Sequence, residues 1–481
     1  MNKEKTIGWN FDNSYSNLPK SFIYEISPVP VKRPELVIFN HDLADQMGLN
    51  FSNVDNEQLA KMFSGNLLPK GSKSLAQAYA GHQFGHFTML GDGRAVLLGE
   101  HISKSNQRLD IQFKGSGQTP FSRNGDGRAA LGPMLREYLI SEAMYSLNIP
   151  TTRSLAVVKT GENVIREKPL QGAILTRVAS SHIRVGTFQF IRTRENLDEL
   201  NTLVNYTIKR HYPEISKSKN NAYDLLSKLI DKQIELVVNW MRVGFIHGVM
   251  NTDNMAISGE TIDYGPCAFM DSYNLGTCFS SIDHMGRYAY GNQPAITKWN
   301  LARFAECLLT LINPKKDDAL KMATELIDKF DKIYEEKWFN MMKSKLGLIG
   351  DDKEDNLIIF ELLEIMKKQE LDYTNTFLFL MDHEIDDKKS YQNEEFDNWK
   401  MKWQKRLTKD SKNLMELNNP VIIPRNHNVE NVLKSAENND LTPFNDLLQA
   451  LKNPYTNQKV LNKYQSPPTK SDEKYQTFCG T

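Results

Sequence analysis

The 481-residue chain contains only four cysteines, at positions 267, 278, 307 and 479, and none of them forms a CxxC pair. Without such a pair a thiolate zinc site is not expected, and the length excludes a small secreted disulfide scaffold. An excess of charge is also missing, because 59 Lys and Arg residues balance 59 Asp and Glu residues. A protein that mainly coats nucleic acid or an anionic membrane carries a basic excess. We therefore expect neither nucleic acid nor a membrane as a partner.

Long apolar runs are missing as well. No stretch approaches the roughly 20 residues that a membrane-spanning helix needs, and the opening residues MNKEKTIGWNFDNSY lack the apolar core of a signal peptide. We therefore expect a soluble, cytoplasmic protein and a monomer. Apolar residues make up 40% of the chain and charged residues 25%, as in globular proteins. The length exceeds that of one ordinary domain, so several structural units are expected.

Glycine, by contrast, is concentrated between residues 77 and 153, where the motif GDGR occurs twice, at 91–94 and 125–128. Glycines let backbone N–H groups approach a phosphate closely, and the arginine adds positive charge. A single GDGR is more often a hairpin turn. Two copies on either side of a strand lysine favour a ligand with several phosphates.

That lysine is Lys114, at the end of a strand that the alternating pattern LDIQFKG predicts over 109–115. A second strand is predicted over 95–100 and a helix over 133–149. In kinase-like folds a strand lysine grips phosphate oxygens and is held by a glutamate of the next helix. Glu137 is the expected partner, and Glu142, on a different face, is the alternative. A solvated strand end is the other interpretation of the lysine.

The segment 247–265 follows a helix predicted over 222–243. Kinases carry H-R-D-x-x-x-x-N and then D-F-G, in which the Asn and the second Asp bind metal. Here His247 precedes Asn254 by seven positions, and Asp263 begins the tripeptide DYG. A carboxylate and an amide on adjacent loops suit Mg²⁺, which takes oxygen ligands.

The catalytic aspartate of kinases is missing from this segment. Its position is taken by Val249, which cannot accept a proton, and only Asp253 is placed to replace it. Phosphoryl transfer to a hydroxyl is therefore in doubt. Arg177 and Arg184, which follow a strand predicted over 172–179, are candidates for an anion clamp, although a lone arginine is usually a surface residue.

Three long strings carry a family resemblance: YAGHQFGHFTMLGDGRAVLLGE, KGSGQTPFSRNGDGRAALGPMLREYLISEAM and HGVMNTDNMAISGETIDYGP. They resemble the selenoprotein O family of protein adenylyltransferases, from about residue 20 to the end of the chain. The resemblance implies an α/β (α+β) fold with a protein-kinase-like two-lobe core that binds ATP in a flipped orientation. AMP would then pass to Ser, Thr or Tyr hydroxyls of proteins, with Mg²⁺ or Mn²⁺ as the metal.

The resemblance also implies roles for single residues. Asp253 is similar to the family's proton acceptor, and Asn254 and Asp263 to its metal ligands. The positions similar to its ATP contacts are Gly91, Gly93, Arg94, Lys114, Asp126, Gly127, Arg177, Arg184 and Asp263.

Four segments are expected. Residues 1–74 form an N-terminal extension, of which the first 70 are predicted to be irregular, and residues 75–310 form the kinase-like nucleotide-binding core. A helical C-terminal region at 311–452 and a tail at 453–481 follow. A protein kinase and a non-catalytic nucleotide-binding scaffold are the alternatives. Val249 counts against the kinase, and the intact Lys, Asn and Asp set counts against the scaffold.

The cysteines suggest a redox hypothesis. The family often ends in a cysteine or selenocysteine, and Cys479 keeps the thiol close to the chain end here. Cys278 is the partner we expect for a reversible disulfide, with Cys267 as the alternative. Cys307 lies in an apolar helical pattern and is expected to be buried and inert.

Overall fold

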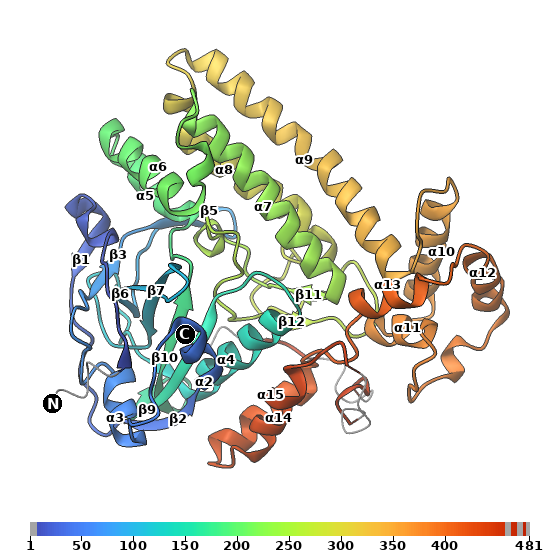
Figure 1. Ribbon diagram of the computed structural model, residues 1–481, viewed down its shortest axis with the longest axis horizontal. Helices are drawn as coiled ribbons and strands as arrows, with labels where there is room; N and C mark the ends of the chain where they lie inside the picture. The colour runs from blue at the N-terminus through green and yellow to red at the C-terminus, as the bar shows by residue number, and fades with distance from the viewer. Residues whose placement is uncertain (1–6, 457–462, 469–474, 478–481) are drawn as a thin grey trace.

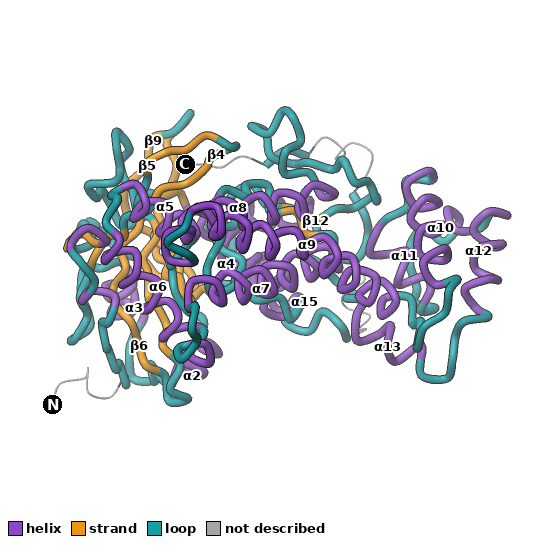
Figure 2. The backbone as a smooth tube through the Cα atoms, turned by 90° about the horizontal axis from the view of Figure 1, so that it is seen from above, coloured by secondary structure: helices purple, strands orange, loops and turns teal. Residues whose placement is uncertain are grey.

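The computed structural model describes residues 7–456, 463–468 and 475–477. The molecule is a mixed α/β protein in which the strands gather at one end and long helices extend from them, as both Figure 1 and Figure 2 show. Among the described residues, no helix is both long and apolar enough to cross a membrane.

The main sheet is antiparallel and runs in the order β1-β3-β6-β7-β10-β9-β2, with β8 attached to β10. Two small antiparallel pairs, β4–β5 and β11–β12, lie outside it. The strands are β1 (Ile23–Glu25), β2 (Glu35–Phe39), β3 (Leu75–Gln77), β4 (Ala80–Gln83), β5 (His86–Met89), β6 (Ala95–Ile102), β7 (Arg108–Lys114), β8 (Ala129–Ala130), β9 (Arg153–Ile165), β10 (Pro169–Ala179), β11 (Phe245–Ile246) and β12 (Ala268–Phe269).

The helices cover the sheet and build the other end of the molecule. They are α2 (His41–Met47), α3 (Asn56–Phe63), α4 (Leu131–Ser146), α5 (Val185–Thr193), α6 (Leu197–His211), α7 (Asn221–Val243), α8 (Gln293–Ile312), α9 (Lys316–Lys345), α10 (Asp355–Lys368), α11 (Tyr373–Leu380), α12 (Glu394–Gln404), α13 (Ser411–Asn418), α14 (Asn426–Glu437) and α15 (Thr442–Leu451). A short 3₁₀ helix, η4 (Thr252–Asn254), carries part of the site.

Alternate side chains of strand β7 form one apolar face and one polar face. Ile111 and Phe113 are buried in the apolar cluster that contains α2 and α3. Side chains alternate along a strand, so Gln112 and Lys114 face the opposite side. Gln112 pairs across the ladder with Arg177 of β10, and directly opposed residues share a face. The sheet therefore presents Lys114 and Arg177 on one surface.

The strands predicted at 95–100, 109–115 and 172–179 correspond to β6, β7 and β10, and the predicted helices correspond to α4 and α7. The coarse expectation of a mixed α/β protein with a helical C-terminal region is confirmed. The prediction that residues 1–70 are irregular is wrong, because this segment forms two strands and the helices α2 and α3. Each helix is short and begins at a side-chain cap, Asn40 for α2 and Asp55 for α3.

Candidate active site

Four buried or half-buried charges meet where β7, β10 and α4 face the loop after α7. Lys114 Nζ lies 2.7 Å from the Glu137 carboxylate. Arg177 donates to Glu137 from Nε at 2.6 Å and lies 3.0 Å from Asp263. Lys114 also donates to Asp263. Two cations and two carboxylates therefore balance one another at the center of the site.

The charges of this cluster support one another. Burial alone would raise the pKa of the Asp263 carboxyl, but Lys114, Arg177 and Arg94 hold it well below its usual range. The pKa of Glu137 is likewise lowered, since the attraction of Arg177 and Lys114 outweighs burial. Both carboxylates are therefore ionised at neutral pH. Arg94, which is half-buried, is the additional cation that acts on Asp263.

The glutamate that contacts Lys114 is Glu137, in the second turn of α4. The alternative, Glu142, is engaged elsewhere: it accepts from Arg153 Nε at 2.8 Å and from Asn40 Nδ2 at 2.8 Å. The two glutamates are five positions apart in the sequence, which places them on different sides of the helix. Only one of them reaches the lysine.

The loop with Asn254 and Asp263 is enclosed by the short ladder of β11 and β12. His247, which is fully buried, contacts the carbonyl oxygen of Ile262 at 2.9 Å and so joins the two halves of the loop. Asn254 donates through Nδ2 to the carbonyl of Val249 at 3.0 Å. That bond uses one of the two N–H donors of the amide and leaves its oxygen available for a ligand.

Asp253 lies beneath the β4–β5 hairpin. A Cβ on Gly81 would sit 2.2 Å from Asp253 Oδ1, so only glycine allows this approach. The hairpin is tied to the loop by the bond from His82 N to Thr252 Oγ1, 2.7 Å long. Asp253 is 7% exposed, and no described residue forms a hydrogen bond with its Oδ1, although the Gln83 side chain interacts with the carboxyl group. Burial raises the pKa of this carboxyl to about 6, while Arg184 and Gln83 oppose the shift.

Arg184 is the buried N-cap residue of α5. Its Nη1 donates to the carbonyl of Asp253 at 3.3 Å, and its guanidinium lies 4.3 Å from the center of the Tyr79 ring. Asp92, the nearest carboxylate, is 3.7 Å away. Burial raises the pKa of the Asp92 carboxyl to about 6, although the positive charge of Arg184 acts to lower it. Arg184 therefore lies beside the Asp253 loop with only a loose ion pair.

The two GDGR segments belong to one folded unit. A Cβ on Gly91 would lie 2.4 Å from the Phe121 ring, and one on Gly93 would lie 2.8 Å from the Phe121 carbonyl oxygen. Gly127 accepts from Gly117 N at 3.0 Å. Asp126 is exposed and pairs with Arg166 at 2.8 Å. The structure thus packs the first GDGR turn onto the loop that carries the second, and leaves Asp126 outside the central charge cluster.

Comparison with known proteins identifies the family of the chain. Residues 5–452 match the family model described as protein adenylyltransferase SelO. The chain is 64% identical to the protein nucleotidyltransferase YdiU of Pelagibacter ubique over 482 residues, which cover 99% of this chain and 100% of the relative. It is 55% identical to the YdiU proteins of Nitrosococcus oceani and Clostridium perfringens over 486 residues, 100% of this chain and 99% of each relative. The chain belongs to the SelO family of protein adenylyltransferases.

Membership of the SelO family makes this protein a nucleotidyltransferase, with ATP and proteins as its substrates. The resemblance drawn from the three sequence strings is therefore confirmed, and so is the enzyme class.

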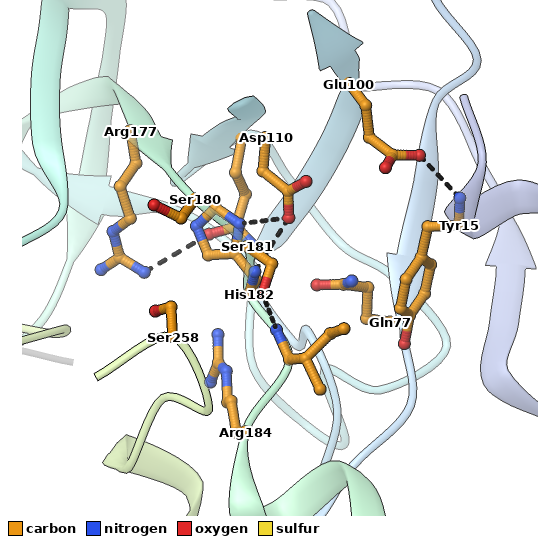
Figure 3. A network of polar contacts seen from close by, with 12 residues as sticks. Tyr15, Gln77, Glu100, Asp110, Arg177, Ser180, Ser181, His182, Arg184 and Ser258 are labelled. Carbon is orange, nitrogen blue, oxygen red and sulfur yellow. Dashed lines mark hydrogen bonds and ion pairs between the residues drawn. The ribbon is translucent and has the colours of Figure 1, made fainter. Parts of the chain in front are cut away.

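Sequence reasoning missed a second polar network of this SelO protein, shown in Figure 3. Asp110 contacts His182 Nδ1 at 3.0 Å and accepts from Arg210 at 2.6 Å. Despite burial, Arg210 and His182 lower the pKa of Asp110 to about 2, and burial lowers the pKa of His182 to about 4. The signal was present, since Asp110 shares the polar face of β7 with Lys114. The ion pair between Asp110 of β7 and Arg210 of α6 links the sheet to that helix.

The cysteines of this SelO protein differ in exposure. Cys267 and Cys307 are buried, which raises the pKa of each thiol to about 12. Cys278 is half-buried, and burial together with Asp283 raises its pKa to about 11. Cys479 lies outside the described residues. Thr477, two positions before it, forms a parallel bridge with Ser280. The tail thus reaches the segment that contains Cys278.

Proposed function

We propose that residues 75–310 form a protein-kinase-like two-lobe core, with residues 1–74 as an extension, a helical region at 311–452 and a tail at 453–481. The contact between Lys114 of β7 and Glu137 of α4, with Asp263 on the facing loop, supports this proposal. The same three roles recur in protein kinases. We also propose that the protein acts as a cytoplasmic monomer on protein acceptors and on neither nucleic acid nor membranes, as its balanced charge favours.

In the proposed reaction ATP binds in the flipped orientation, with its α-phosphate towards the acceptor. The hydroxyl oxygen of a Ser, Thr or Tyr side chain attacks the α-phosphorus, the bond to the bridging oxygen of the β-phosphate breaks, and pyrophosphate leaves. Asp253 takes the hydroxyl proton. The observation that carries this role is a buried carboxylate whose Oδ1 has no hydrogen-bond partner among the described residues and whose pKa of about 6 suits a base near neutral pH.

The cationic side chains have the second task, which is to neutralise charge on the phosphates. Lys114, Arg177 and Arg184 are the residues proposed to hold the leaving pyrophosphate, and Arg94, Gly91 and Gly93 to hold the nucleotide with Gly127 and Asp126. Preorganised charges of this kind are the main catalytic need in such transfers. Arg177 is fixed in advance by Glu137, at 2.6 Å from Nε.

A divalent cation fits the remaining ligands. The described residues contain no group of three or more His, Cys, Asp or Glu side chains that could hold a metal alone. Mg²⁺ at nucleotide sites takes one or two protein oxygens and completes its shell with phosphates and water. Asp263 and the available amide oxygen of Asn254 match that pattern. When bound, Mg²⁺ or Mn²⁺ would supply charge neutralisation at the phosphates.

The decisive test supplies the protein with ATP labelled at either the α or the γ phosphate. We expect acceptor protein to gain label only from the α-labelled nucleotide and to gain the mass of one adenylate. Asp263→Ala should abolish the transfer while circular dichroism stays native. Transfer of the γ label would refute the proposal and restore the protein kinase alternative.

We also propose redox control through a reversible disulfide between Cys278 and Cys479. The bridge between Thr477 and Ser280 supports a tail that reaches this segment. Peptide mapping without reductant after mild oxidation should detect the linkage. Unchanged oxidised and reduced transfer rates in Cys479→Ser, compared with wild type, would contradict it.

A further inference from the structure

A cavity of about 360 Å³ lies in the helical half of the molecule, among residues of α7 to α11 and of the segment 273–291. It shares no lining residue with the charge cluster around Asp263. Its volume falls within the range of sites that bind small ligands or single side chains. The proposed transfer mechanism makes no use of it.

The walls of this cavity are mainly aromatic. Tyr273 stacks on Tyr373 with ring centers 5.8 Å apart, and Tyr290 meets Tyr273 edge-on at 6.4 Å. The hydroxyls of Tyr290 and Tyr373 donate to the carbonyl of Met241 at 2.7 and 2.9 Å, which fixes both rings. The rest of the aromatic wall consists of Phe330, Tyr334 and Trp338.

The charge around the cavity is negative. Asp331 and Glu335 line it from α9, and Asp331 is paired with Lys298 at 2.6 Å. Glu335 is exposed and has no ion-pair partner among the described residues. Burial and the charge of Glu364, on α10, raise the pKa of Tyr273 to about 12. Two carboxylates of α9 therefore line the aromatic cavity, and the charge of Glu364 acts on one of its rings.

The protein itself places an amine against this aromatic wall. Lys345 Nζ lies 5.1 Å from the center of the Tyr373 ring and 3.9 Å from that of Phe377. Lys345 is buried and donates to the carbonyl of Arg242 at 2.9 Å. Tyr334 and Trp338, which are half-buried, form the more open part of the aromatic wall. Among the described residues, no lysine or arginine lies over either ring, so a cation from outside can reach them.

We propose that this cavity binds the guanidinium of an arginine side chain on the protein substrate. Aromatic faces attract cations, and a planar guanidinium stacks on them and pairs with carboxylates better than an ammonium does. The chain itself links the cavity to the site. Tyr290, which lines the cavity, lies two positions after Tyr288, whose hydroxyl donates to Asn251 Oδ1 at 2.7 Å, next to the helix that carries Asp253. Only the substrate assignment rests on the proposed function.

The binding test uses the full chain without ATP. The probe is the peptide acetyl-Gly-Gly-Arg-Gly-Gly-amide, and citrulline and leucine replace arginine in two matched peptides. Calorimetry should detect saturable binding of the arginine peptide and about tenfold weaker binding of the other two. The double variant Glu335→Gln/Glu364→Gln should bind the arginine peptide several-fold more weakly than wild type. Glu336→Gln, an exposed neighbor that does not line the cavity, should have no effect.

A transfer test addresses the substrate assignment. Acceptor peptides with one tyrosine and an arginine at varied distances are compared with citrulline twins, using α-labelled ATP. We expect a lower KM, with unchanged kcat, for arginine at a preferred distance, and loss of that difference in the Glu335/Glu364 double variant. Equal binding of citrulline or leucine peptides would overturn the cation site. Peptide binding without any effect of arginine on KM at any distance would overturn the substrate role, while α-label transfer itself would still stand.

Discussion

Removing the charge of Glu137 while keeping its shape tests the balance of the central cluster. In Glu137→Gln, Lys114 and Arg177 stay buried, at 5% and 3% exposure, with Asp263 as their only carboxylate. Removing one partner of a buried ion pair typically costs about 3–5 kcal/mol. Asp263 offsets part of this loss, so we expect Glu137→Gln to lower the free energy of unfolding by about 3 kcal/mol. That is a large share of the roughly 5–15 kcal/mol by which domains are stable.

The double variant Glu137→Gln with Lys114→Met separates charge balance from packing. Each single change leaves one unbalanced buried charge, whereas the double variant is neutral again. The loss of unfolding free energy in the double variant, measured by urea denaturation, should therefore be about 2 kcal/mol smaller than the sum of the two single losses. AMP transfer should stay low in all three variants. Glu142→Gln, which affects the separate Arg153 pair, should be additive with Lys114→Met. If the losses of unfolding free energy in Glu137→Gln and Lys114→Met also add within about 0.5 kcal/mol, charge balance does not stabilise the cluster.

Four further outcomes follow from the structure. The transfer rate should rise as the pH passes about 6, because Asp253 accepts a proton only when ionised; a flat profile between pH 5 and 8 would contradict its role as the base. The raised pKa also means that the folded state loses stability as the pH rises from about 4 to 6, so Asp253→Asn should have the higher urea midpoint at pH 7. Gly81→Ala should lower transfer while ATP binding persists, because its Cβ would displace Asp253 Oδ1; wild-type turnover would show that the hairpin yields freely. Cys278 should react slowly with iodoacetamide at pH 7.5 and faster towards its pKa of about 11; rapid alkylation at pH 7.5 would contradict the burial argument.

Local patterns in the sequence were sufficient for the elements that carry the site. The alternation in LDIQFKG predicts both β7 and the polar face of Lys114, and helical spacing predicts α4 with Glu137. These features depend on neighbors within a few residues. The short N-terminal helices were missed because two turns give a weak periodic signal, and their caps, Asn40 and Asp55, resemble ordinary loop residues.

The tertiary relations of the site could not be predicted in the same way. The contact between Arg177 and Glu137 depends on the register of β10 against β7 and on how α4 packs on the sheet. The burial of Asp253 depends on a glycine 172 positions earlier in the chain. Asp92, which lies inside a motif that suggested a phosphate loop, accepts from Gln77 N at 3.0 Å in the folded protein. No local pattern contains that information.

The two carboxylates of the central cluster differ in one respect that bears on the proposed mechanism. The Glu137 side chain is 2% exposed, whereas that of Asp263 is 26% exposed, although both pair with Lys114 and Arg177. We propose that Asp263, the more exposed of the two, would hold the divalent cation, which would supply charge neutralisation at the phosphates. Lys114 and Arg177 would then be able to donate to phosphate oxygens, while Glu137 would keep its bonds to both side chains. Before ATP binds, Lys114 and Arg177 stabilise the ionised Asp263 carboxylate. An unpaired Asp263 would instead carry the cost of burying a charge.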